Sequence, residues 1–133
     1  MKGIYVLLIS VGNCTRVNVG ALGTVTLKRG LYAYVGSAQN SFEKRIARHL
    51  RNEKKKFWHI DYLLEHANVR VMKVFYRRAR RPEECRIAKR LGRKGLPIRG
   101  FGSSDCRCQS HLFRIEDYGF LRRHMSETVV ESD

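Results

Sequence analysis

Acidic residues are scarce in this sequence, and long apolar runs are absent. Twelve Asp and Glu stand against 27 Lys and Arg, which leaves a formal net charge of +15. Such an excess of one sign favours a polyanionic partner, and nucleic acid is the first class that it indicates. No apolar run approaches the roughly 18 to 20 residues that a spanning helix requires, so we expect no segment inside a membrane.

Proline is also scarce, with two residues, and neither an internal repeat nor a low-complexity linker interrupts the chain. A length of 133 residues, 43% of them hydrophobic, fits a single core. We therefore expect one domain over residues 1–125, followed by an acidic, flexible tail at residues 126–133.

The first apolar stretch, GIYVLLIS, has the period-two character of a strand, and the NCTR that follows argues against a cleaved signal. This pattern indicates a cytoplasmic protein. In that compartment cysteines are expected to be free or metal-bound, not paired in disulfides. The chain has four of them: Cys14, Cys85, Cys106 and Cys108.

The hydrophobic pattern predicts an α+β domain, in which helices flank a small central antiparallel sheet. Strands are predicted over residues 3–10, 31–38 and 69–77, with a hairpin within residues 14–30. The remainder, residues 96–125, is expected to hold a glycine- and serine-rich loop, a short strand and a basic terminal helix.

Three further helices are predicted from their caps and apolar stripes. The first follows Asn40 or Ser41, and its stripe consists of Phe42, Ile46 and Leu50. The second spans residues 58–67, and its buried face is expected to contain Ile60, Leu63, Leu64 and Ala67. The third begins at Pro82, the favoured first helical position, and ends near Gly92 or Gly95.

Arg45 and His49 are four residues apart, so they share one side of the first helix. That side is expected to face the end of the preceding strand at Gly36. An arginine fork and an imidazole there can clamp a phosphate, whereas the alternative is an ordinary solvated basic face.

Glu84 falls on the apolar face that Ile87, Ala88 and Leu91 form in the third helix. An ionised carboxylate on such a face needs a cation or hydrogen-bond donors to offset its desolvation. A single carboxylate can hold a mostly hydrated Mg²⁺ or Mn²⁺. The alternative is a residue that favours the helix macrodipole and pairs with an arginine.

Tyr5, Tyr32 and Tyr34 lie on neighbouring predicted strands, and Tyr32 and Tyr34 project to the same face. Packing is the ordinary role of tyrosines on strands. A phenol beside a metal and an arginine can also lose its proton more easily and activate a water.

Cys106, Cys108 and His111 cluster in SDCRCQSHLF, and Cys85 can supply a fourth ligand to a Cys₃His zinc site. Cys-x-Cys chelation is less common than Cys-x₂-Cys. The spacing therefore favours the alternative, a buried or redox-active loop.

Basic residues fall in several runs with few aromatic residues between them, which favours contact with a phosphate backbone over base stacking. These residues are expected to supply affinity without sequence choice. The nucleic-acid-binding residues predicted in this way are Arg48, Lys54, Lys55, Lys56, Arg77, Arg78, Arg80, Arg81, Lys89 and Arg90.

Two short motifs and three later residues resemble the GIY-YIG nuclease superfamily. GIY stands at Gly3, Ile4 and Tyr5, and YVG, a variant of the second motif, stands at Tyr34, Val35 and Gly36; Arg45, His49 and Glu84 match the later positions. More closely, the chain resembles a branch of that superfamily whose members are small stand-alone proteins, and the resemblance covers nearly its whole length. The hairpin between the two motifs would then be an insertion.

The resemblance implies a role for each of these residues. Tyr5 would act as general base, Tyr34 would orient it, Arg45 would stabilise the charge of the transition state, and Glu84 would hold Mg²⁺. His49 would assist Arg45 or protonate the leaving oxygen. Many members also use a late asparagine, and none follows Asn68 here.

The resemblance therefore implies a metal-dependent endonuclease that acts on DNA, in preference to RNA, during repair, recombination or processing. Two other classes stay open. One is a non-catalytic nucleic-acid-binding module with the same fold, and the other is a zinc-stabilised interaction protein built on the cysteine cluster. The sequence indicates no oligomeric state.

Overall fold

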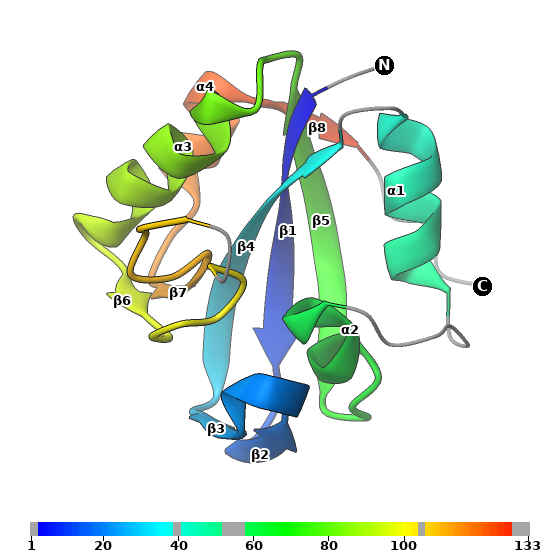
Figure 1. Ribbon diagram of the computed structural model, residues 1–133, viewed down its shortest axis with the longest axis vertical. Helices are drawn as coiled ribbons and strands as arrows, with labels where there is room; N and C mark the ends of the chain where they lie inside the picture. The colour runs from blue at the N-terminus through cyan, green and yellow to red at the C-terminus, as the bar shows by residue number, and fades with distance from the viewer. Residues whose placement is uncertain (1–2, 39–40, 52–57, 104–105, 129–133) are drawn as a thin grey trace.

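The structure is a computed structural model that describes residues 3–38, 41–51, 58–103 and 106–128. Its centre is a six-stranded antiparallel sheet with the order β6-β7-β4-β1-β5-β8, and helices cover both faces (Figure 1). The predicted α+β class is therefore confirmed. None of the helices in the described part of the chain is long and apolar enough to cross a membrane.

The middle of the sheet is β1 (Gly3–Val11), which pairs with β4 (Gly30–Ala38) on one side and β5 (Val69–Arg77) on the other. Nearly every residue of β1 is buried. Both faces of this strand are covered, which explains why its sequence is apolar almost without interruption. The register places Tyr5 opposite Gly36.

The predicted hairpin between β1 and β4 is present as β2 (Thr15–Asn18) and β3 (Thr24–Leu27), joined through the 3₁₀ turn η1 (Gly20–Leu22). The two strands form a separate small sheet beyond one end of β1 and β4 (Figure 1). Their insertion leaves the pairing of β1 with β4 continuous.

On one face of the sheet lie α1 (Phe42–Leu50) and α2 (His59–Leu64). The Ser41 hydroxyl accepts a hydrogen bond from the Lys44 N–H at 3.2 Å, so this predicted cap is confirmed. The predicted stripe of α1 is partly wrong, because Leu50 is 39% exposed and His49 is buried beside Ile46. The second helix is shorter than predicted, and Ala67 lies beyond its end, exposed.

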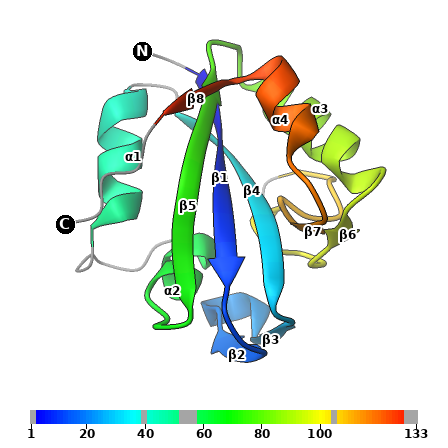
Figure 2. The same cartoon turned by 180° about the vertical axis from the view of Figure 1, so that it is seen from behind.

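The opposite face is covered by α3 (Pro82–Gly92) and α4 (Gly119–His124), and Figure 2 shows these two helices on the side of the sheet away from α1. Helix α3 begins at Pro82 as predicted. Its residues Ile87, Ala88 and Leu91 are buried in a core cluster with the even-numbered residues at the start of β1.

The remaining strands are β6 (Leu96–Pro97), β7 (Leu112–Ile115) and β8 (Ser126–Thr128). Strand β7 pairs with β4 only as far as Tyr34, so the last residues of β4 extend past it. Residues 126–128, which the sequence analysis assigned to the tail, instead pair with β5, and Lys73 contacts Glu127 across this pair. This ion pair compensates the one acidic side chain of the edge strand.

Candidate functional site

A cleft of about 670 Å³ lies at the end of β4 where β7 no longer covers it. Residues from both faces of the sheet reach it, because α1 approaches from one side and the N-terminus of α3 from the other (Figure 1). Four of the five residues to which the GIY-YIG resemblance assigns a role line this cleft together: Tyr5, Tyr34, Arg45 and Glu84.

The side chain of Tyr5 crosses the backbone of Gly36 to reach the cleft. A Cβ on residue 36 would lie 2.3 Å from the Tyr5 hydroxyl and 2.4 Å from the ring carbon that bears it. No side chain can occupy that position without displacing the ring. The YVG motif therefore requires glycine at residue 36 in this chain, because Tyr5 fills the space that a side chain there would occupy.

The Tyr5 hydroxyl lies 2.7 Å from Nε2 of His49, and both residues are buried. Three aromatic rings surround the His49 imidazole, at centroid separations of 5.3 Å for Tyr5, 6.4 Å for Tyr34 and 5.9 Å for Trp58. His49 therefore does not project to solvent beside Arg45 as a second surface donor. The hydrogen bond between His49 and Tyr5 explains why His49, and not the predicted Leu50, lies on the buried face of α1.

Burial raises the pKa of Tyr5 well above its ordinary value, and the nearby Arg45 guanidinium lowers that pKa by less than burial raises it. The pKa of Tyr34 is also raised, first by burial and then by its electrostatic interactions with Tyr5, Glu84 and Asp61. Both phenols consequently keep their protons at neutral pH. The retained phenolic proton can be donated to His49 when Nε2 is the unprotonated nitrogen of that imidazole.

The two arginines of α1 stack on the same tryptophan but have different surroundings. The guanidinium carbons of Arg45 and Arg48 lie 4.3 and 4.2 Å from the centroid of Trp58. Arg48 also donates two hydrogen bonds to Asp61, at 2.8 and 2.9 Å, and the Trp58 N–H donates to the same carboxylate at 2.9 Å. Arg45, not Arg48, lines the cleft.

Trp58 and Asp61 were not among the residues predicted from the sequence. Asp61 has no exposed surface, and it lies on the buried side of α2 with Ile60 and Leu63. Asp61 lies next to the apolar stripe of α2, and Arg48 lies on the helix before it. This combination was a signal for a buried ion pair. Trp58 is the one tryptophan of the chain, and its place two residues after the basic run was the signal for a cation–π contact.

Glu84 approaches the cleft from the first turn of α3, and its side chain is 19% exposed. One carboxylate oxygen lies 3.2 Å from Nδ1 of His111. The partner that the structure shows for Glu84 is therefore a histidine, and not the arginine of the alternative interpretation. A single carboxylate that lines an open cleft beside Arg45 still fits one protein ligand of a mostly hydrated Mg²⁺ or Mn²⁺.

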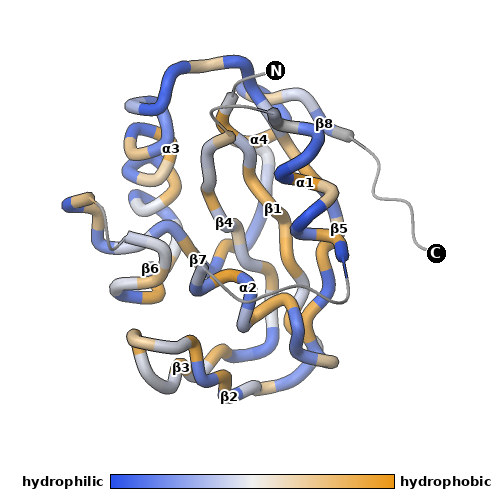
Figure 3. The backbone as a smooth tube through the Cα atoms, turned by 45° about the vertical axis from the view of Figure 1, so that its right-hand side comes forward, coloured by the Kyte–Doolittle hydropathy of each residue, from blue (hydrophilic) through white to orange (hydrophobic). Residues whose placement is uncertain are grey.

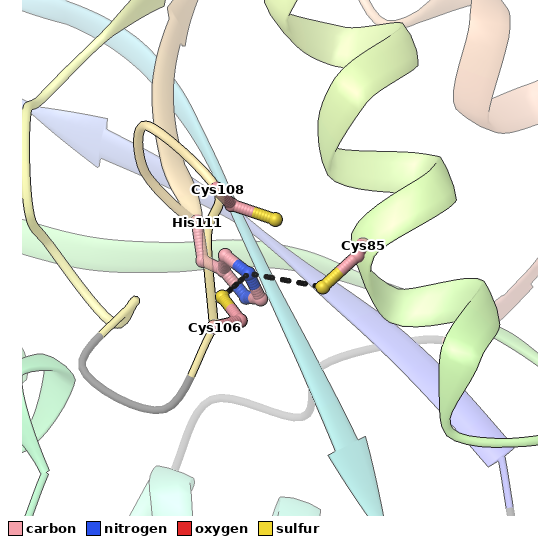
Figure 4. A group of neighbouring side chains, drawn as sticks. All are labelled: Cys85, Cys106, Cys108 and His111. Atoms are coloured by element: carbon pink, nitrogen blue, oxygen red, sulfur yellow. Dashed lines mark hydrogen bonds between the residues drawn. The ribbon is translucent and has the colours of Figure 1, made fainter.

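His111 belongs to a second group, which it forms with Cys85, Cys106 and Cys108 (Figure 4). The four ligand atoms all lie within 4.8 Å of one another. Cys85 projects from α3, and the other three come from the segment before β7. All four cysteines of the chain are free, as expected, and Cys14 is exposed and outside the group.

The predicted phosphate contacts fall into separate regions. The exposed arginines before α3 are Arg77, which ends β5, and Arg78, Arg80 and Arg81 on the strongly hydrophilic segment between β5 and α3 (Figure 3). Of these, Arg81 lines the cleft. Lys89 and Arg90 are exposed on α3, and Arg90 lines a different groove of about 330 Å³ between α3 and α4. The residues Lys54, Lys55 and Lys56 lie outside the described part of the chain.

A family model described as "Domain of unknown function DUF123" matches residues 4–132. The match covers nearly the whole chain, so the chain belongs to this family. No curated protein and no solved structure matches the chain. The resemblance to GIY-YIG nucleases stays a prediction.

Proposed function

We propose that this member of the DUF123 family is an endonuclease that hydrolyses phosphodiester bonds of DNA in the cleft between α1 and α3. The observation that carries the proposal is the 2.7 Å contact between the buried Tyr5 hydroxyl and His49 Nε2, at the wall of a cleft also lined by Arg45 and Glu84. A proton donor and acceptor, an arginine and a carboxylate are the groups that phosphodiester hydrolysis uses.

In this proposal Tyr5 and His49 act together to activate water. The attacking water gives a proton to the phenolic oxygen of Tyr5, while the phenolic proton passes to His49 Nε2. The water oxygen bonds to phosphorus, the bond to the leaving oxygen breaks, and that oxygen takes a proton from solvent. A relay of this kind does not require a free phenolate, so it is compatible with the raised pKa of Tyr5.

Arg45 is the residue proposed to stabilise the charge on the phosphate. Its guanidinium lines the cleft and is positioned by the ring of Trp58, 4.3 Å away. A positioned guanidinium contributes most when charge accumulates on the non-bridging oxygens. Mg²⁺ or Mn²⁺ at Glu84 would supply further positive charge next to those oxygens.

Arg77, Arg78, Arg80 and Arg81 support binding to a phosphate backbone, because they are exposed and Arg81 reaches the cleft itself. Contacts of this kind give affinity that depends on salt and not on sequence. We therefore propose weakly specific or structure-selective cleavage, because a domain of this size has little surface for base readout.

The test is a cleavage assay with labelled linear, flap and four-way DNA and with RNA, in Mg²⁺, in Mn²⁺ and in chelator. Tyr5→Phe is the decisive variant, since it removes one oxygen and leaves the ring in place. Its control is Tyr32→Phe, because Tyr32 is buried on the same face but donates to the Lys28 carbonyl, away from the cleft. We expect Tyr5→Phe to lose about 10²-fold or more in rate and Tyr32→Phe to keep the wild-type rate.

Binding to the same substrates separates catalysis from a binding module. In a nuclease, Tyr5→Phe and Glu84→Gln lose turnover without weaker binding, because affinity comes from the arginines and lysines. Salt-sensitive binding with no cleavage of any substrate would contradict the proposal. That outcome would favour the non-catalytic module on this fold.

A further inference from the structure

We propose that Cys85, Cys106, Cys108 and His111 bind one Zn²⁺ in a closed structural site that connects α3 to the segment before β7. The proposal is independent of the nuclease function, because its evidence is the geometry of these four residues alone. It reverses the preference of the sequence analysis, which favoured a buried or redox-active loop on the basis of spacing.

The distances among the four ligand atoms fit a tetrahedral zinc ion. Nε2 of His111 lies 3.3 Å from Sγ of Cys106 and 4.0 Å from Sγ of Cys85. Zn–S bonds of ~2.3 Å and Zn–N bonds of ~2.0 Å at tetrahedral angles place ligand atoms about 3.5 to 3.8 Å apart. No atom of the set lies more than 4.8 Å from another, so small side-chain adjustments complete the site.

The hydrogen bonds of His111 prepare it as a ligand. Its Nδ1 lies 3.3 Å from the Val35 carbonyl oxygen and 3.2 Å from a Glu84 carboxylate oxygen, both of which accept hydrogen bonds. The ring proton therefore belongs on Nδ1, and the lone pair of Nε2 points toward the cysteines. A carboxylate or carbonyl that orients a histidine in this way is the usual outer partner at a zinc site.

Burial and ligand type also favour zinc. His111 is 2% exposed, and the three cysteines are half-buried around it (Figure 4). Three thiolates and one imidazole are soft ligands that select zinc over magnesium or calcium. Four protein ligands leave no position for a substrate, so the site is structural.

The location of the site gives it a consequence for the cleft. The described residues between β6 and β7 have little regular structure, and they include glycines at positive φ at residues 100 and 102. Cys85, Cys106 and His111 line the cleft. Zinc would therefore fix one wall of the cleft. Glu84 would connect the zinc site to the cleft, because it is the outer partner of His111 and also part of the cleft lining.

The first experiment measures metal content by mass spectrometry after purification without chelator, followed by titration with one equivalent of Zn²⁺. We expect one zinc per chain in the wild type and a loss of stoichiometric zinc in Cys106→Ser and Cys85→Ser. The matched control is Cys14→Ser, which changes the exposed cysteine outside the group and should keep one zinc. Glu84→Gln should keep the zinc but bind it about 10- to 100-fold more weakly, as loss of an outer partner does.

A second measurement on the unmodified chain avoids any dependence on variants that fold poorly. With zinc bound, one thiol should react rapidly with a thiol reagent, and chelator should expose all four. Co²⁺ in place of Zn²⁺ should give the thiolate charge-transfer and visible bands of a tetrahedral site. Four reactive thiols in the presence of zinc, or a disulfide within the group, would overturn the proposal.

Discussion

The Tyr5 hydroxyl occupies the space where residue 36 would have a Cβ, since an ideal Cβ there would lie 2.3 Å from it. This relationship joins the two strand motifs through one contact across the β1–β4 pair, in which Tyr5 and Gly36 face each other. The geometry of the cleft wall depends on this contact, because the same phenol reaches His49.

Gly36→Ala should therefore displace Tyr5 and disturb the site. Both the ring and the strand are in the core, so overpacking should lower the free energy of unfolding by ~1 to 3 kcal/mol. Chemical unfolding measures this change, and Gly12→Ala is the control, because its new Cβ would meet only the Asn68 carbonyl at 3.7 Å. Equal stability of the two variants would show that Tyr5 does not need the space above Gly36.

The ion pair of Arg48 and Asp61 should be a major structural contact. Asp61 is fully buried and accepts hydrogen bonds from Arg48 and from the Trp58 N–H. Asp61→Ala leaves those donors without their acceptor and should lower the free energy of unfolding by ~3 kcal/mol or more. Glu116→Gln, at an exposed carboxylate, should change it by less than ~0.5 kcal/mol.

The same pair also separates the roles of the two arginines of α1. If Arg48 is structural and Arg45 faces the substrate, Arg45→Ala should weaken nucleic-acid cleavage and leave stability close to that of the wild type. Arg48→Ala should mainly lower the free energy of unfolding. Thermal unfolding and cleavage rates of the two variants, measured side by side, test this assignment, and the reverse pattern would contradict it.

Local pattern was sufficient to predict most elements of this fold. The apolar run of β1, the glycine-bearing hairpin and the Pro82 start of α3 are all present in the structure. Strand β8 was not predicted, because its residues look like an acidic tail until β5 offers a partner. An edge strand of three residues depends on a contact about 50 residues away, and no local preference encodes it.

The candidate site likewise contains residues that a local pattern predicts and contacts that depend on distant parts of the chain. The sequence predicted Tyr5, Tyr34, Arg45 and Glu84 of the cleft, but not Trp58. It also did not predict the partners of His49 and Glu84, which lie 44 and 27 residues away along the chain. The Cys-x-Cys spacing alone is weak evidence for zinc. Only the approach of α3 to the loop shows that Cys85 lies close enough to complete a set of four.

Arg78 and Arg80 should contribute nucleic-acid affinity without sequence preference. They are exposed on the segment before α3. Replacement of both by alanine should weaken binding to every sequence alike and reduce the slope of log K against log salt by about 2. Fluorescence anisotropy across a range of salt concentrations measures both effects. Arg70→Ala, at the opposite end of β5, is the control and should leave the slope unchanged.

His59 should make the attachment of the glycine loop sensitive to pH. The Gly102 N–H donates to Nδ1 of His59 at 2.9 Å, so the imidazole must be neutral at that atom. Burial lowers the pKa of His59 below its ordinary value of 6.5. As the pH falls below 6.5, His59 takes up a proton more readily in the unfolded chain than in the folded chain. The stability that His59 contributes is therefore present at neutral pH and lost on acidification.

The comparison of wild type with His59→Asn isolates this contribution. The asparagine side-chain oxygen can accept the same hydrogen bond but does not titrate, so the variant should lose less stability than the wild type between pH 7 and pH 5. Acid protonation of the cysteine and histidine group acts in both proteins and cancels in the difference. Identical pH profiles of unfolding free energy would show that the Gly102 hydrogen bond does not depend on a neutral His59.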